Sequence, residues 1–385
     1  MLENLKIENF RGFQSFELQQ LGRVNLLVGQ NNSGKTSILE AIQLLCSRTN
    51  LEPLRKMMKN RGEYFQSDES RVYSKVLDIR HLFHGHELKL DSEFSILGKN
   101  IENSEQLSLF EYLEKLIVSV GVSSRYKSKQ NSDDAISENN LDETIAEETL
   151  SINIQWSDES VKEDFERPLS IDGGLSEEYI RRARMIDSSK DKPIKTQFIT
   201  SSSLTASEMI EFFDQVILTT EEKVIQEALK MIEPNIERIA AVSSRKYRNS
   251  DFREGFVVLR ADNHQRVPIG SFGDGTWRIL GLALAIVNVK DGVLLVDEID
   301  TGLHFTAMSK MWKLIWETAK RLNVQVFATT HNSDCWKSLA SIACQENIHE
   351  AGGITIQRIE PDKNTAIAFN EREIVIAAER DIEVR

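Results

Sequence analysis

Cysteines are scarce in this sequence and form no pattern. Only three occur in 385 residues, and they are not clustered: Cys46, Cys335 and Cys344. A disulfide framework needs paired cysteines and a zinc site needs clustered ones, so we expect neither. The scarcity also favours a reducing compartment, and we expect a cytoplasmic protein.

Long apolar runs are missing as well. No stretch approaches the roughly 20 apolar residues that a membrane-spanning helix requires. The opening residues 1–6 lack a basic region followed by an apolar stretch, so we expect no signal peptide and no membrane partner. The net charge of −13 argues against a uniformly basic nucleic-acid surface, although it leaves room for a local basic groove.

Repeats and heptads are also absent. No segment sustains a heptad pattern over three heptads, which excludes a long coiled-coil arm. The composition, with 40% hydrophobic and 28% charged residues, is typical of a globular protein with one large domain or two ordinary ones. Residues 131–150 differ, because they contain seven acidic and no basic residues, and we expect an acidic, mobile loop there.

Apolar patterning predicts an α/β fold. Residues 24–28 form a run that is apolar except for Asn25 and ends in glycine, as a buried parallel strand does, and helical spacing follows from Thr36. The last third alternates in the order helix 276–289, strand 293–296, helix 305–322 and strand 324–330. Such alternation builds a parallel sheet, whose ligands bind at the carboxyl ends of the strands.

Shorter elements are expected elsewhere in the chain. They are strands at 5–10 and 13–18, a strand pair within 77–96, two helices within 206–233, and a hairpin of 256–259 with 266–269. Thr219 and Glu222 match a capping box for the second of the two helices.

The segment from Gly29 to Thr36 matches the pattern G-x-x-x-x-G-K-[ST]. Its glycines let backbone N–H groups point at phosphate oxygens, beside the positive end of the following helix. We expect Lys35 to reach the β- and γ-phosphates of ATP and the Thr36 hydroxyl to ligate Mg²⁺. The buried strand before the loop and the amphipathic helix after it disfavour a plain glycine-rich turn. The candidate nucleotide-binding residues are Gly29, Asn31, Asn32, Ser33, Gly34, Lys35, Thr36 and Ser37.

Two acids follow the strand at 293–296. We expect Asp297 to hold Mg²⁺ and Glu298 to polarise the water that attacks the nucleotide. Alone, such a pair often only marks the end of a strand, but the phosphate loop strengthens the functional interpretation. His331 ends the neighbouring strand, where its imidazole is expected to sense or stabilise charge in the transition state. The candidate catalytic residues are therefore Lys35, Glu298 and His331.

Four segments together resemble bacterial ABC-type ATPases of the RecF/SMC/OLD class, in the stand-alone group of AAA15-like and AAA21-like ATP-binding proteins. They are LKIENFRGF at 5–13, the phosphate loop at 29–36, the signature-like PIGSFGDGT at 268–276, and DEIDTGLH at 297–304. The resemblance implies an ABC/SMC-like P-loop NTPase head, a mixed β-sheet flanked by helices, split between residues 1–97 and 196–385. Residues 98–195 would form a helical or irregular insertion.

In that family two heads meet face to face around two nucleotides, and each γ-phosphate touches the signature segment of the other head. The resemblance therefore implies an ATP-dependent dimer in which Ser271, Gly273 and Gly275 bind the nucleotide of the partner copy. It also implies that Arg11 lies near the nucleotide. The plain alternatives are a capped helix N-terminus for the first three residues and an exposed turn arginine for the fourth.

The sequence departs from the family pattern at several points. The signature does not read Leu-Ser-Gly-Gly-Gln, and no glutamine stands at an obvious Q-loop position. The nearest candidate, residues 81–86, offers three histidines instead, for which alternation along a strand is favoured over metal ligation. His304 stands where many D-loops carry an acid, and no TOPRIM-like cluster of acids is evident after His331.

The leading hypothesis is an ATPase that works as a nucleotide-dependent dimeric switch. The resemblance suggests prokaryotic anti-phage defence or DNA maintenance, with a nuclease or toxin as a separate effector. A second hypothesis is a DNA-binding clamp in which ATP drives dimerisation more than turnover. Its candidate basic surfaces are Arg55 and Lys56 with Lys59 and Arg61, Arg181 and Arg182 with Arg184, and Arg245 and Lys246 with Arg248. A third, the ATPase subunit of a membrane transporter, is disfavoured by the opening segment and the large insertion.

Overall fold

The centre of the molecule is a six-stranded sheet in which every strand but one runs parallel. The computed structural model describes residues 1–67, 74–100, 114–127, 145–183, 193–242, 255–262, 265–345 and 353–384. The sheet order is β11 (Thr196–Ile199), β15 (Val293–Val296), β16 (Gln325–Thr329), β3 (Val24–Gly29), β17 (Ile354–Ile359) and the antiparallel β18 (Ile367–Phe369). β3, β15 and β16 are buried along their whole length, as parallel strands covered on both faces are.

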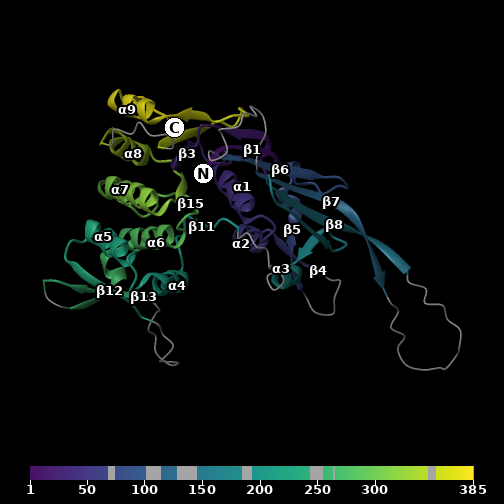
Figure 1. Cartoon of the computed structure of the whole chain (residues 1–385), viewed down its shortest axis with the longest axis horizontal. Helices are drawn as coiled ribbons and strands as arrows, with labels where there is room; N and C mark the ends of the chain where they lie inside the picture. The colour runs from purple at the N-terminus through teal and green to yellow at the C-terminus, as the bar shows by residue number, and fades with distance from the viewer. Residues whose placement is uncertain are drawn as a thin grey trace.

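Helices cover one face of this sheet, and Figure 1 shows them stacked along one side of the molecule. They are α6 (Asp274–Asn288), α7 (Phe305–Leu322), α8 (Ser333–Gln345) and α9 (Glu371–Glu379). Their core includes Leu26 and Val326, whereas α1 (Lys35–Ser47) shares a second core with Leu27 and Phe327 on the opposite face. Because successive strand residues alternate between faces, the central sheet holds the two cores together. The expected mixed α/β fold is confirmed.

A second large sheet is antiparallel and packs against α1. Its order is β2 (Phe13–Leu18), β1 (Leu2–Phe10), β6 (Glu93–Asn100), β7 (Glu114–Lys127), β8 (Ile145–Ser157) and β9 (Lys162–Pro168). Its buried side chains belong to the same core as those of α1. β7 and β8 form a long ribbon that projects from the body of the molecule (Figure 1).

The described part of residues 98–195 is built mainly from strands. The expected boundary between residues 97 and 98 falls inside β6, and β7 to β9 continue the sheet that β1 and β2 begin. One helix, α3 (Glu177–Ala183), follows. The expectation of a helical or irregular insertion is corrected accordingly. The acidic loop expected at 131–150 lies mostly outside the described residues, and its last residues, 145–150, belong to β8.

Two three-stranded sheets complete the described architecture. One consists of β10 (Gly174–Ser176), β5 (Ser74–Asp78) and β4 (Tyr64–Ser67), beside α2 (Glu52–Asn60). The other consists of β12 (Ile236–Val242), β13 (Gly255–Arg260) and β14 (Arg266–Pro268), beside α4 (Ala206–Val216) and α5 (Glu222–Ile232). The expected hairpin is confirmed as β13 and β14. The strand pair expected within 77–96 is wrong, because two 3₁₀ turns, Ile79–Leu82 and His84–His86, separate strands of different sheets.

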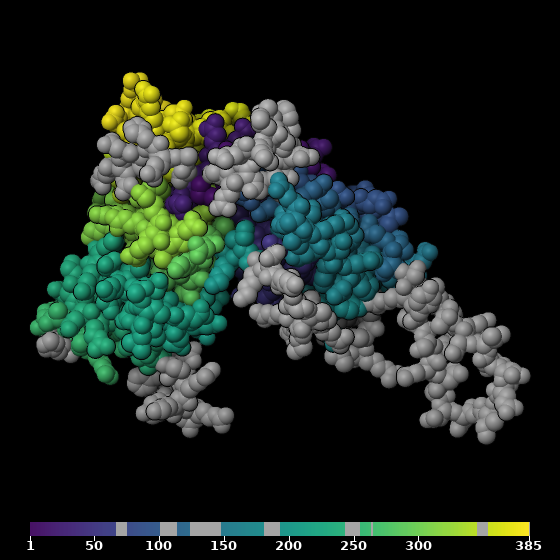
Figure 2. All heavy atoms as spheres, in the orientation of Figure 1, coloured from purple at the N-terminus to yellow at the C-terminus, as the bar shows by residue number. Residues whose placement is uncertain are grey.

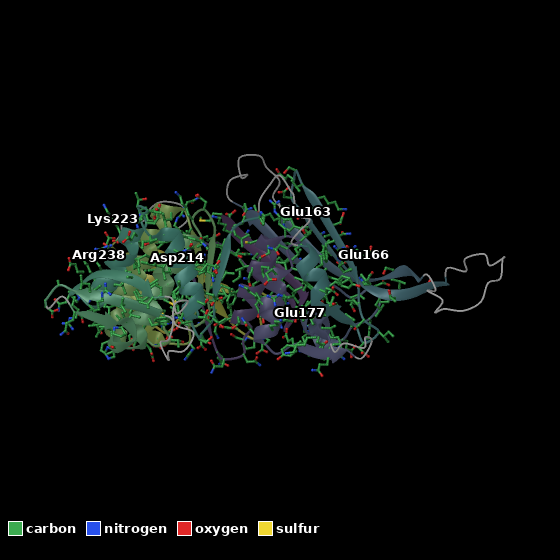
Figure 3. The ribbon with its side chains drawn as sticks, turned by 90° about the horizontal axis from the view of Figure 1, so that it is seen from below. Glu163, Glu166, Glu177, Asp214, Lys223 and Arg238 are labelled. Carbon is green, nitrogen blue, oxygen red and sulfur yellow. The ribbon has the colours of Figure 1, made fainter. Side chains whose placement is uncertain are left out.

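The molecule thus has two lobes on either side of the central sheet. We call α4, α5 and β12 to β14 the helical lobe, and the second large sheet with α2, α3, β4, β5 and β10 the sheet lobe. Figure 3 marks the helical lobe by Asp214, Lys223 and Arg238, and the sheet lobe by Glu163, Glu166 and Glu177. Figure 2 shows the surface hollowed between the two lobes. Among the helices of the described residues, none is both long and apolar enough to cross a membrane.

Candidate nucleotide site

The phosphate loop joins the buried end of β3 to the start of α1, and two glycines give it its shape. Gly29 has a φ of 148°, and a Cβ there would come 2.5 Å from the carbonyl oxygen of Ile359. Gly34 has a φ of 89°, and a Cβ there would come 2.3 Å from the ring of Phe13. Both positions therefore require glycine. The Phe13 ring, at the start of β2, packs directly against the loop.

Lys35 is the first residue of α1, and its side chain returns over the loop. Its ammonium group donates to the carbonyl oxygens of Gly29 at 2.9 Å and Gln30 at 2.6 Å. Burial lowers the pKa of Lys35, and the negative charges of Asp297 and Glu298 oppose this shift. A cation is thus held between the loop and the two acids that follow β15.

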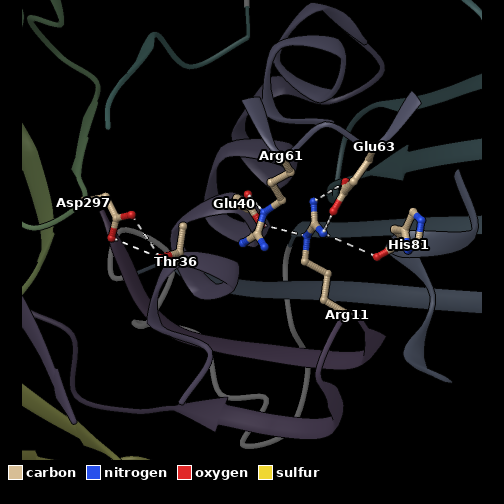
Figure 4. A network of polar contacts seen from close by, with 7 residues as sticks. All are labelled: Arg11, Thr36, Glu40, Arg61, Glu63, His81 and Asp297. Carbon is tan, nitrogen blue, oxygen red and sulfur yellow. Dashed lines mark hydrogen bonds and ion pairs between the residues drawn. The ribbon is translucent and has the colours of Figure 1, made fainter. Parts of the chain in front are cut away.

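Residues from three neighbouring strand ends meet beside Lys35. The Thr36 hydroxyl lies 3.1 Å from both carboxylate oxygens of Asp297 (Figure 4). The Thr329 hydroxyl, at the end of β16, donates to Asp297 at 2.6 Å and accepts the backbone N–H of Glu298 at 2.8 Å. This convergence follows from the topology, because β3, β16 and β15 are parallel neighbours that end at one edge.

The spacing of Thr36 and Asp297 suits a magnesium ion. Adjacent ligands of octahedral Mg²⁺, each about 2.1 Å from the ion, are roughly 2.9 Å apart. The observed 3.1 Å between hydroxyl and carboxylate oxygens is close to that value, and both groups are the hard oxygen ligands that Mg²⁺ prefers. Among the described residues no cluster of three His, Cys, Asp or Glu side chains could hold a metal alone, so substrate oxygens and water would complete the shell.

Glu298 has an unusual backbone conformation. Its φ of 46° lies in the left-handed region, which non-glycine residues adopt at some cost. The side chain is half-buried and accepts a hydrogen bond from the Thr301 hydroxyl at 3.2 Å. The next turn is fixed as well, because the Thr330 hydroxyl donates to the buried Asp300 at 2.6 Å. The loop after β15 is therefore held in one shape.

A pocket of about 260 Å³ collects most of the predicted residues. Its lining consists of Asn31, Asn32, Ser33, Gly34, Lys35, Thr36, Ser37, Arg61, Asp297, Glu298, Thr329, Thr330 and His331. His331 is exposed at the rim, just beyond β16. The phosphate loop, both acids and the histidine thus face one space, although they come from segments some 300 residues apart in the chain.

Arg11 does not line this pocket, in contrast to what the resemblance implied. Its guanidinium is buried behind α1, where Nε pairs with Glu40 at 2.8 Å and Nη1 pairs with Glu63 at 2.6 Å (Figure 4). The ion pairs explain the correction, because two carboxylates hold the guanidinium within the sheet lobe. Arg11 supports α1 rather than facing the pocket.

Arg61 takes a place that the sequence did not predict. Its Nε and Nη2 donate to Glu40 at 2.7 and 3.0 Å, and the residue lines the pocket beside Thr36 and Asp297. Burial raises the pKa of Glu40, and the charges of Arg11 and Arg61 oppose this shift. Glu40 lies one turn of α1 after Thr36, so the spacing of the phosphate loop could have revealed it. Arg61 itself gave no local signal.

The signature-like segment lies outside the pocket. Ser271 and Gly273 are exposed at the start of α6, and Gly273 has a φ of 86°. Gly275 packs against the loop after β15, where an added Cβ would lie 3.2 Å from the carbonyl oxygen of Gly302. Within one chain, Ser271, Gly273 and Gly275 therefore do not join the residues around Lys35.

The three histidines of residues 81–86 are also remote from the pocket. His84 Nδ1 lies 3.1 Å from the carbonyl oxygen of Arg11, and His81 Nδ1 lies 3.3 Å from His86 Nδ1. They occupy 3₁₀ turns rather than a strand, so the expected strand alternation is wrong. Residues 81–86 were the nearest candidate for a Q-loop, but they do not lie beside Asp297. The end of β11 lies there, since the Asp297 N–H donates to the carbonyl oxygen of Ile199 at 2.8 Å.

A larger cleft of about 590 Å³ adjoins the pocket, on the side of the hollow between the lobes (Figure 2). It is lined by α1, α2, the end of β11 and residues 200–208. Thr36, Arg61 and Asp297 line both spaces. The pocket is therefore open toward the interior of the hollow as well as toward the face that carries His331.

The basic surface predicted on α2 is largely neutralised by acids. Arg55 pairs with Glu52 at 2.5 Å, and Lys59 pairs with Glu177 at 2.8 Å. Arg61 is held by Glu40 as described above. The residues 181–184 and 245–248 of the other two predicted surfaces have side chains outside the described part of the structure.

The chain is similar in sequence to several known proteins. The family model described as an AAA ATPase domain matches residues 1–335. An "ATP/GTP phosphatase" of Helicobacter pylori is 23% identical over 87% of this chain and 86% of its own length. "DNA replication and repair protein RecF" of Actinobacillus pleuropneumoniae is 30% identical, but over only 29% of this chain and 30% of RecF.

SMC heads are among the solved structures that are similar to this chain. The SMC head domain from Thermotoga maritima covers 96% of this chain and 98% of its own, with 11% identity and a TM-score of 0.41. An SMC head bound to the C-terminal winged-helix domain of ScpA covers the same shares, with 14% identity and a TM-score of 0.45.

Proposed function

The chain belongs to the AAA ATPase domain family and is an ATPase of the RecF-like class, and from this premise we propose that it is a nucleotide-dependent switch that hydrolyses ATP between two copies of itself. One observation carries the proposal. Thr36 and Asp297, 261 residues apart in sequence, lie 3.1 Å apart at the mouth of the phosphate loop. This is the arrangement that a magnesium–nucleotide complex requires.

The residues of the pocket divide the work between binding and hydrolysis. Lys35 and the loop N–H groups bind the phosphates, and Thr36 with Asp297 would hold Mg²⁺. The ion, when bound, neutralises phosphate charge. Glu298 is the general base that orients and deprotonates the attacking water, and its fixed backbone keeps the carboxylate at the edge of the pocket.

Two further side chains lie around the space for the phosphates. His331 stands at the exposed rim and would stabilise charge that develops in the transition state. Arg61 stands on the interior side, with Nε and Nη2 engaged by Glu40. Its Nη1 makes no hydrogen bond among the described residues and is free to face an anion.

The exposed signature-like segment supports a dimer. Ser271 offers an exposed hydroxyl just before α6, and Gly273 is exposed beside it, with its N–H on the carbonyl oxygen of Gly270 at 3.3 Å; both lie outside the pocket of their own chain. A second copy arranged head to head would bring its segment to the γ-phosphate of the first, and by symmetry the reverse. ATP then joins the two copies, and hydrolysis separates them.

The biological setting that fits this switch is prokaryotic anti-phage defence or DNA maintenance in the cytoplasm. Support comes from the resemblance of the four motif segments to RecF, SMC and OLD proteins, and from relatives named for DNA replication and repair. A nuclease or toxin would act as a separate effector that reads the dimeric state. Among the described residues the DNA-clamp alternative has no specific support, because Arg55 and Lys59 of α2 are paired with acids.

The test is the substitution Glu298→Gln. It removes the base but keeps the size and hydrogen bonding of the side chain, so the variant should bind ATP as the wild type does. Turnover should fall on the order of 100-fold or more, and the protein should accumulate as a dimer with ATP in size-exclusion chromatography with light scattering. Wild-type turnover by this variant would remove Glu298 from its assigned role.

A further inference from the structure

Arg278 lies inside the protein, two residues after the signature-like segment and about one turn after the start of α6. It belongs to α6, and its side chain is 2% exposed. Nη1 donates to the carbonyl oxygen of Thr200 and to the Ser203 hydroxyl, each at 2.9 Å. Nη2 donates to the carbonyl oxygens of Asp297 at 3.0 Å and Glu298 at 2.9 Å. One guanidinium therefore joins α6, the end of β11 and the end of β15.

This arrangement is costly for a purely structural contact. No carboxylate forms an ion pair with Arg278 among the described residues, and its Nε has no hydrogen-bond partner there. Burial lowers the pKa of Arg278, and the charges of Asp300, Asp297 and Glu298 oppose the shift. Well-packed apolar side chains often stabilise a protein as well as a buried charge does. The charge therefore points to a role beyond packing.

The bonds of Arg278 end on the backbone that aims the base. Glu298 has a left-handed φ of 46°, a conformation that persists only where its surroundings impose it. Arg278 holds the carbonyl groups of both Asp297 and Glu298, while Thr329 holds the N–H between them. Removal of the guanidinium would release the carbonyl side of this peptide and let the carboxylate of Glu298 leave its position.

We propose that Arg278 is a positioning residue that couples the signature-like segment to the Glu298 of the same copy. The proposal rests on the proposed function, because the segment must touch the nucleotide of the partner copy. An anion bound at Ser271 and Gly273 would displace the first turn of α6. Arg278 lies on the next turn, so its hydrogen bonds would transmit this displacement to the backbone of Glu298. Each copy thereby senses occupation of the other copy's site before it hydrolyses its own ATP.

The experiment compares Arg278→Met, Arg278→Lys and a matched control, Arg23→Met. Arg23 likewise donates to main-chain carbonyls, those of Ala319 and Val324, but at the end of β3 away from the phosphate loop. Each variant is assayed for affinity for a fluorescent ATP analogue, for ATP-dependent dimerisation in a Glu298→Gln background, and for kcat and KM as protein concentration rises.

The account expects Arg278→Met to bind the analogue and dimerise within about threefold of wild type, while kcat falls on the order of 30-fold. Arg278→Lys keeps the charge and some hydrogen-bond donors, so its kcat should lie between that of the wild type and that of Arg278→Met. Arg23→Met should keep the wild-type kcat. The KM should stay nearly constant in all three, because the binding residues are unchanged.

Two results would overturn the coupling role. One is a wild-type kcat in both Arg278 variants. The other is a kcat that falls only in proportion to ATP binding or dimerisation, which indicates a merely structural role; if Arg278→Met does not fold, the same criterion applies to Arg278→Lys. Failure of the proposed function looks different, since the wild-type kcat would then not rise with protein concentration and Glu298→Gln alone would not dimerise.

Discussion

The phosphate loop and the signature-like segment differ in how complete their surroundings are within one chain. Around the loop, one pocket is lined by Lys35, Thr36 and Asp297, and the Thr36 hydroxyl contacts the Asp297 carboxylate. Ser271 and Gly273 instead stand exposed at the start of α6. The difference indicates that one chain builds the binding half of the site, and that the half which triggers hydrolysis is directed outward. Substitutions in the two regions should therefore fail in different ways.

The largest effect is expected for Lys35→Ala, in the complete region. It removes the cation that contacts the phosphates, so both ATP binding and turnover should be lost, the latter on the order of 1,000-fold. Equilibrium binding of a fluorescent ATP analogue and phosphate release measure the two quantities. Retained tight binding would mean that the loop does not hold the nucleotide as described.

Ser271→Glu tests the exposed region. A carboxylate at this position would repel the γ-phosphate of the partner copy, so turnover should fall on the order of 100-fold. ATP binding by the separate chain should stay within about twofold, because Ser271 lies outside the pocket. Ser341→Glu, on the exposed side of α8, is the matched control. Equal loss in both variants would contradict the role of the segment.

Arg61→Ala should have an intermediate effect. Arg61 lines the pocket, and its Nη1 makes no hydrogen bond among the described residues, so turnover should fall on the order of tenfold, with partial recovery in Arg61→Lys. Arg55→Ala is the control, because Arg55 lies on α2, which ends just before Arg61, pairs with Glu52 and does not line the pocket. Steady-state turnover at saturating ATP is the measurement, and identical rates in the alanine variants would place Arg61 outside the site.

The smallest effect on turnover is expected for Arg11→Met. Arg11 is buried against Glu40 and Glu63, so its loss leaves Glu63 without this partner and leaves the buried Glu40 with Arg61 alone, and it should lower the free energy of unfolding by about 3 kcal/mol. Turnover of the folded protein should change less than about threefold. Urea unfolding and ATPase assays separate the two quantities. A large loss of turnover at unchanged stability would indicate that Arg11 acts at the nucleotide after all.

Much of the fold and of the binding half of the site could be predicted from local sequence. The loop from Gly29 to Thr36 and the acids after β15 depend on short patterns, and parallel strand ends bring them together by topology alone. β3, α6, β15 and α7 were likewise marked by apolar periodicity. In these segments the local pattern and the tertiary environment favour the same structure.

Residues that depend on long-range contacts could not be predicted in this way. Arg61 reaches the pocket only because Glu40 holds it, and Arg278 matters only because β11 and β15 end beside it. The capping box was also misplaced: it occurs at Thr205 and Glu208, before α4, whereas α5 begins without a side-chain cap. A capping pattern does not show which of two nearby helix starts will use it.

The central claim, that each site is shared by two copies, is tested most directly by mixing Lys35→Ala with Ser271→Glu. Each variant alone should be nearly inactive. In a mixed dimer the intact loop of one copy faces the intact signature-like segment of the other, so one of the two sites is restored. Because the Arg278 coupling requires both sites to be occupied for turnover, the measurement is ATP-dependent dimerisation with both variants in a Glu298→Gln background. Neither variant alone should dimerise, whereas an equal mixture should form dimers through the one intact shared site, up to the half of the pairs that are mixed. A mixture as monomeric as its separate components at every ratio would contradict the account.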